Sequence, residues 1–201
     1  MTLAMVGCGS ASNDDQGVSF TNLGFFSVDT ETNACEETGV SSAIVSIGTS
    51  VGSNSLTGAS LCIGLQNNLS GQFIRSERAT ITYSIPGAAL QPPSAVVPVS
   101  AIMGPGSAGA STSLPDGVTN ESRVISGILL LPAETLRFLS VNRGALPRAP
   151  YTMIASAAVT GVTSAGDSLE TNPAEIAIQV TTASLSATGS EAAIEDPALF
   201  E

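Results

Sequence analysis

Four carboxylates gather in one short polar stretch of the chain, at Asp29, Glu31, Glu36 and Glu37. Carboxylate oxygens are the ligands that calcium prefers in proteins, so this stretch is a candidate calcium site. Its spacing does not match the EF-hand loop, however, and an acidic loop can equally be a solvated one. We therefore predict that the protein has no cofactor, and keep a calcium-binding surface module as the alternative.

Catalytic side chains are scarce in the rest of the chain. The sequence has no histidine and no lysine, and its six basic residues are all arginine. These absences exclude a Ser-His-Asp triad, histidine-ligated zinc and Schiff-base catalysis. Two carboxylates can hydrolyse a glycoside, but no spacing in this sequence singles out such a pair. We predict a protein that is not an enzyme, and keep a carboxylate-dependent hydrolase as the least favoured alternative.

The composition also limits the partners of the protein. Its formal net charge is −11, whereas nucleic acids and anionic membrane surfaces require clustered basic residues. Glycan sites rely on aromatic platforms, and the chain has no tryptophan and only two tyrosines, Tyr83 and Tyr151. A glycan-binding module stays an alternative, but protein partners or self-assembly are the interactions that we expect.

The first eight residues read Met-Thr-Leu-Ala-Met-Val-Gly-Cys, and a polar, acidic stretch follows. A short apolar run, a small residue (Gly7) and then a cysteine resemble the end of a bacterial lipoprotein signal peptide. The resemblance implies that Cys8 carries a lipid, that this lipid is the only membrane contact, and that the protein lies in the cell envelope or outside the cell. Met5 stands where that family prefers leucine, and the charged and long apolar upstream regions are missing. The alternative is a chance apolar start.

If Cys8 is lipidated, the exported chain keeps two further cysteines, Cys35 and Cys62. Their pairing would close a loop of 27 residues, which by chain entropy contributes roughly 3–4 kcal/mol. Cys62 lies between Leu61 and Ile63, so on a strand it points to the opposite face from these two side chains. The bridge would then pin the acidic stretch to the outside of a sheet. The alternative is two free thiols in a cytoplasmic protein.

Period-two alternation of apolar residues predicts the strands that position these groups. The alternation is clearest at residues 151–182, where a turn at 164–167 joins two strands, and at residues 74–85. Residues 95–103 are predicted to be an edge strand, because Pro98 lies within them and cannot donate to a sheet.

Three further stretches complete the predicted secondary structure. The nearly continuous apolar run at 124–131 predicts a central strand covered on both faces. Residues 133–143 are predicted to be the one helix, since a proline precedes them and a glycine follows. The acidic residues 29–39 are predicted to be a loop.

Short strands, turns rich in glycine, proline and serine, and a single helix predict an all-β protein. We expect an antiparallel β-sandwich of seven to eight strands, because the final hairpin is similar to the last two strands of immunoglobulin-like or fibronectin-like modules. A jelly roll is the alternative. The expected organisation is a leader at residues 1–17, the sandwich at 18–183 and an acidic tail at 184–201.

Together these features favour a non-enzymatic structural or adhesive module on the cell surface or in the extracellular matrix. A more specific version is a fibre subunit, since a sandwich with an edge strand can accept a strand from its neighbour. The donor would be an apolar segment near the start of the chain that is predicted to be well buried, with Val18, Phe20, Phe25, Phe26 and Val28. The alternative is that this segment packs within its own domain.

Overall fold

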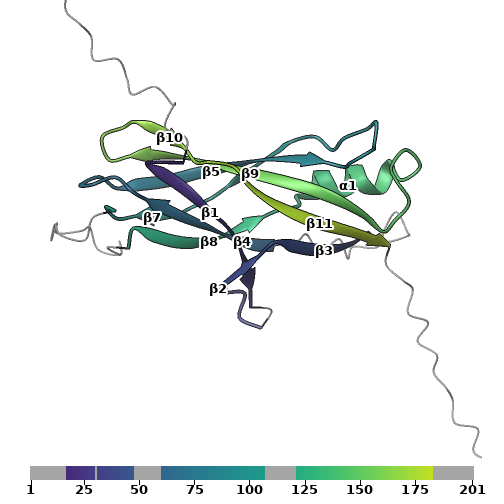
Figure 1. Cartoon of the computed structure of the whole chain (residues 1–201), viewed down its shortest axis with the longest axis horizontal. Helices are drawn as coiled ribbons and strands as arrows, with labels where there is room; N and C mark the ends of the chain where they lie inside the picture. The colour runs from purple at the N-terminus through teal and green to yellow at the C-terminus, as the bar shows by residue number, and fades with distance from the viewer. Residues whose placement is uncertain (1–16, 30, 48–59, 107–120, 183–201) are drawn as a thin grey trace, which may run out of the picture.

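Alternating apolar side chains build two β-sheets that pack face to face, as expected of a β-sandwich. The computed structural model describes residues 17–29, 31–47, 60–106 and 121–182. Cys8, nearly all of the predicted leader and the predicted acidic tail lie outside these residues. The described part has eleven strands and one helix (Figure 1), which are β1 (Phe20–Val28), β2 (Cys35–Val40), β3 (Ser42–Ile47), β4 (Ser60–Asn67), β5 (Ile74–Ser84), β6 (Ala95–Pro98), β7 (Ile102–Met103), β8 (Arg123–Leu129), α1 (Ala133–Val141), β9 (Tyr151–Thr163), β10 (Ser168–Glu170) and β11 (Ala174–Thr182).

The strand order agrees with the predicted immunoglobulin-like sandwich. The smaller sheet has the order β2-β1-β4-β8, and the larger one has β3-β11-β9-β5-β6, with β10 beside β9 and β7 beside β5. The strands β1-β4-β8 opposite β11-β9-β5-β6 correspond to A-B-E opposite G-F-C-C′ of the immunoglobulin fold. The expected number of strands was too low, because β2, β7 and β10 are short additions to these sheets. All pairings are antiparallel except that of β3 with β11.

The hairpin predicted at residues 151–182 is the centre of the larger sheet. Inward-facing residues of β9 are completely buried at Met153, Ala155, Ala157 and Val159. The turn at 164–167 is present, but it joins β9 to the short strand β10, and β11 then pairs with the first half of β9. Between β10 and β11, the hydroxyl of Thr171 accepts a hydrogen bond from the Val159 N–H. At this position a side-chain oxygen takes the place of the backbone oxygen that a neighbouring strand would supply.

Of two further predicted strands, one has a different position and the other is divided. The apolar run at 124–131 does not form a central strand: β8 is an edge of the smaller sheet and pairs with β4 alone among the described strands. Burial of this run comes mainly from its end, where Leu130 and Leu131 turn into the core ahead of the helix. The edge strand predicted at 95–103 is confirmed, as two short strands, β6 and β7, that both pair with β5.

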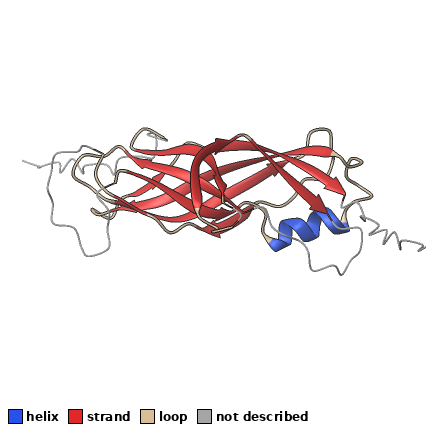
Figure 2. Ribbon diagram, turned by 90° about the horizontal axis from the view of Figure 1, so that it is seen from below, coloured by secondary structure: helices blue, strands red, loops and turns tan. Residues whose placement is uncertain are grey.

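The helix lies at one end of the sandwich (Figure 2) and ends two residues earlier than predicted. Leu136 and Leu139 place its apolar face in the core. Its position is fixed from the larger sheet by Tyr83, whose buried hydroxyl donates a 2.8 Å hydrogen bond to the backbone oxygen of Leu130. Asn142 ends the helix, because its side-chain amide donates to the Phe138 carbonyl at 2.9 Å.

Candidate functional sites

The segment predicted to be exchanged between subunits is strand β1, and it lies between β2 and β4 of its own sheet. A β-bulge between Asn22 and Gly24, where Gly24 has a φ of 104°, shifts the register of the strand by one residue. As a result both Phe20 and Phe25 point into the core, although they are five residues apart. The predicted burial of Val18 is wrong: this side chain is 66% exposed, because it precedes the strand.

Two asparagine side chains, the buried Asn22 and the half-buried Asn172, hold β1 to the larger sheet and the loop before β11. The Asn22 side-chain amide donates to the Ala157 carbonyl at 3.0 Å. Asn172 accepts from the Asn22 N–H at 2.9 Å and donates to the Asn22 carbonyl at 3.2 Å. In this structure the segment therefore packs within its own domain, which was the alternative to exchange.

The predicted disulfide between Cys35 and Cys62 is present, with the two Cα atoms 5.8 Å apart. It connects β2 to β4 across β1, and Cys62 lies opposite Phe26 of β1 and Gly127 of β8. Cys62 is not part of the central core cluster that contains Ile63, so the bridge lies on the outer face of the smaller sheet, as predicted.

A small apolar layer surrounds the disulfide on this outer face. The ring of Phe26 covers Gly64 so closely that a Cβ added to Gly64 would clash with the ring. The guanidinium of Arg123 stacks over the same ring at 5.6 Å from its centroid. These contacts with Gly64 and Arg123 explain why Phe26 is buried although it points away from the core.

The acidic stretch is more ordered than predicted, since residues 35–40 form strand β2 instead of a loop. Asp29 builds the turn before this strand: its Oδ1 accepts the N–H of Glu31 at 2.7 Å and the N–H of Thr32 at 3.1 Å. These backbone hydrogen bonds, that of Thr32 first, hold the pKa of Asp29 below the ordinary aspartate value. The Glu36 carboxylate accepts a hydrogen bond from the hydroxyl of Ser27.

The four candidate calcium ligands are therefore not brought together as a set. Asp29 and Glu36 serve the turn and the neighbouring strand, and Glu31 and Glu37 are exposed. Within the described ranges, no three Asp, Glu, Cys or His side chains are placed to share a metal ion.

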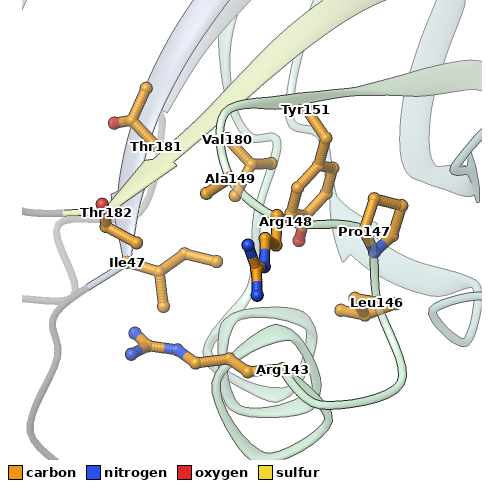
Figure 3. A pocket seen from close by; sticks show the side chains of 10 residues that line it. All are labelled: Ile47, Arg143, Leu146, Pro147, Arg148, Ala149, Tyr151, Val180, Thr181 and Thr182. Atoms are coloured by element: carbon orange, nitrogen blue, oxygen red, sulfur yellow. The ribbon is translucent and has the colours of Figure 1, made fainter.

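A pocket of about 190 Å³ opens beside the end of the helix, and the sequence analysis did not predict it. Its walls come from the end of β3, the end of β11 and the loop between α1 and β9 (Figure 3). Buried apolar side chains line it at Ile47, Leu146 and Val180. Two of the six arginines of the chain, Arg143 and Arg148, complete the lining.

Tyr151 also lines this pocket, next to Arg148 (Figure 3). Burial raises the pKa of the Tyr151 hydroxyl, and the positive charge of Arg143 offsets part of that rise. The hydroxyl is therefore protonated at neutral pH and able to donate a hydrogen bond. The one sequence signal that pointed here is the placement of three of the six arginines between residues 137 and 148.

No protein-family model matches this chain, and no curated protein matches it either. Among the described residues, the only helix is nine residues long, which is too short to cross a membrane.

Proposed function

We propose that this protein is a non-enzymatic, exported module with a structural or adhesive role on the cell surface, anchored through a lipid on Cys8. The observation that carries the proposal is the Cys35–Cys62 disulfide, because such bonds persist in oxidising compartments and are rare in the cytosol. The fold supports it as well. Sandwiches of this type present their loops and faces to partners on a rigid scaffold.

Mass spectrometry of the protein purified from its native cells tests this proposal. We expect a peptide that begins at Cys8 and carries acyl chains, together with a Cys35–Cys62 cross-linked peptide before reduction. A Cys8→Ser variant is the matched control, and it should lose the acyl mass and leave the membrane fraction while keeping the cross-link. Unmodified Cys8 together with free thiols at both other cysteines, in protein from the soluble cytoplasmic fraction, would refute the proposal.

The fibre version of this proposal has its own support in the edges of the sandwich. Edge strands β3, β6 and β8 each carry an exposed apolar side chain, at Ile44, Val96 and Leu129. Exposed apolar edges favour addition of a strand from another chain. Strand exchange would use a different strand: β1 and β2 of one copy would pair with β4 of the next copy, the strand that β1 borders in its own sheet.

The disulfide makes this version directly testable. Cys35 is on β2 and Cys62 is on β4, so exchange of β1 and β2 would place the two cysteines of each bond in different chains. An exchanged fibre would then give a ladder of covalent oligomers on a denaturing gel without reductant, and a single monomer band with reductant. Electron microscopy of the same native sample should show filaments. Monomeric bands under both conditions, with only isolated particles in the images, would exclude exchange through this segment.

A further inference from the structure

The pocket beside the helix combines a positive rim with an apolar interior. We propose that it binds a carboxylate carried on a small apolar group, supplied either by a free organic acid or by the C-terminal residue of a peptide. This inference is independent of the proposed surface role, because it rests only on the residues around the pocket.

The charge of the rim selects the carboxylate. The chain has a formal net charge of −11 and only six cationic side chains, yet two of them line this one pocket. Figure 3 shows the ends of Arg143 and Arg148 on the side of the pocket where Ile47 lies. Guanidinium groups bind carboxylates through paired, parallel hydrogen bonds, which a neutral or cationic group does not offer. The Tyr151 hydroxyl lies next to Arg148 and supplies a further donor (Figure 3).

The interior selects the apolar part of the ligand. Val180, Ile47 and Leu146 are almost completely buried, so they give the pocket a hydrocarbon wall. The pocket, of about 190 Å³, opens between these side chains and has room for a short apolar group such as a leucine side chain or a hexanoyl chain.

The walls are held in place before any ligand arrives. Ile47 and Val180 belong to β3 and β11, which are paired over six residues up to this end of the sheet. The loop from α1 is fixed by Asn142, which accepts from the Ala145 N–H at 2.9 Å and caps the helix with its side chain. A site with rigid walls loses little conformational entropy on binding.

Titration of the isotope-labelled full chain with hexanoate, followed by amide NMR, tests the proposal. We expect saturable shifts at Leu146, Tyr151 and Val180, with affinity at least tenfold weaker for hexanamide, which keeps the chain but lacks the charge. Acetate, which lacks the apolar chain, should also bind at least tenfold more weakly. An N-acetylated dipeptide ending in leucine, as the acid and as the amide, separates the two sources: the source with the lower Kd is the class that the pocket accepts.

Variants locate the site. Arg148→Gln should weaken hexanoate binding at least tenfold, while Arg78→Gln, an exposed arginine of β5 outside the pocket, should leave it unchanged. A second pocket variant, Val180→Thr, changes the apolar wall with the same shape and should weaken the acid and the amide alike. Equal binding of hexanoate and hexanamide would overturn the proposal, and so would the absence of shifts or an unchanged affinity in Arg148→Gln.

Discussion

Removal of the Cys35–Cys62 disulfide should lower the stability of the sandwich by an amount that the sequence separation sets. The bond closes a loop of 27 residues, which contains β2 and β3. Cross-linking a loop of this size removes chain entropy from the unfolded state worth about 3.5 kcal/mol at 25 °C. For a domain of this size each kcal/mol lowers Tm by about 2–4 °C, so the expected loss is about 7–14 °C.

Three samples separate the covalent bond from the packing of its sulfur atoms. Calorimetry and urea unfolding compare three proteins. These are the oxidised wild type, the wild type reduced under denaturing conditions and refolded with reductant, and the Cys35→Ala/Cys62→Ala variant. The reduced protein keeps both side chains, so its difference from the oxidised protein isolates the bond. The variant should be less stable still, because Cys62 is buried and its truncation leaves a cavity.

The dependence of unfolding on urea provides a second readout. Without the cross-link the unfolded chain expands, so the m-value should rise in the reduced protein and in the variant. Oxidised and reduced protein that melt within about 2 °C of each other, with equal m-values, would refute the reasoning. That result would mean that the loop is already restricted in the unfolded chain or that the bond strains the folded one.

Three further predictions concern single side chains. Gly64→Ala should lower the free energy of unfolding by about 1–3 kcal/mol in urea, because the new methyl group meets the Phe26 ring. Gly127→Ala on the adjacent strand meets nothing within 4 Å and should change it by less than about 0.5 kcal/mol, so equal effects would contradict the packing described. Tyr83→Phe should cost about 1–2 kcal/mol in the same assay, because the buried backbone oxygen that it reaches loses its donor; an unchanged midpoint would show that this bond is not needed. The NMR signal of the Asp29 carboxyl carbon should titrate below the ordinary aspartate pKa, and a normal midpoint would exclude the turn bonds. The stability that the ionised carboxylate adds is complete above the pKa of the unfolded state, and it is lost as the pH falls through the pKa of the folded state.

The strands with the strictest alternation were the most predictable from sequence. From Tyr151 to Val159 in β9 and from Ala79 to Tyr83 in β5, every second side chain is apolar. Only one face of each strand can bury that set, so the direction of residues such as Met153 and Ile81 followed from the sequence. The disulfide was predictable for a different reason. With Cys8 set aside, Cys35 and Cys62 are the two cysteines left in a chain expected to be exported, and such cysteines pair.

Features that depend on contacts distant in sequence were not predictable. The edge position of β8 is set by which strands pair with it, and an apolar run such as residues 124–131 looks the same at an edge and in the centre. The acidic stretch became β2 because β1 was available to pair with it. The pocket needed Ile47, Arg148 and Val180 to meet, and these residues are separated by tens of positions along the chain.

The disulfide also determines how the domain would respond to tension if it is held at its N-terminal end and pulled at its C-terminal end. Without the bond, the pull would run through β3 and β11, which are parallel neighbours paired from Ser42 to Ile47, so it would shear all their hydrogen bonds at once. With the bond, tension passes from Cys35 directly to Cys62 and bypasses the chain between them, a sequence separation of 27. At about 3.5 Å per extended residue, that keeps roughly 95 Å of chain from being drawn out. Strand β3 then stays unloaded at the edge of the larger sheet, and one wall of the pocket, at Ile47, keeps its position. The other wall, at Val180, Thr181 and Thr182, lies at the loaded end of β11, so the oxidised disulfide protects the β3 side of the pocket alone.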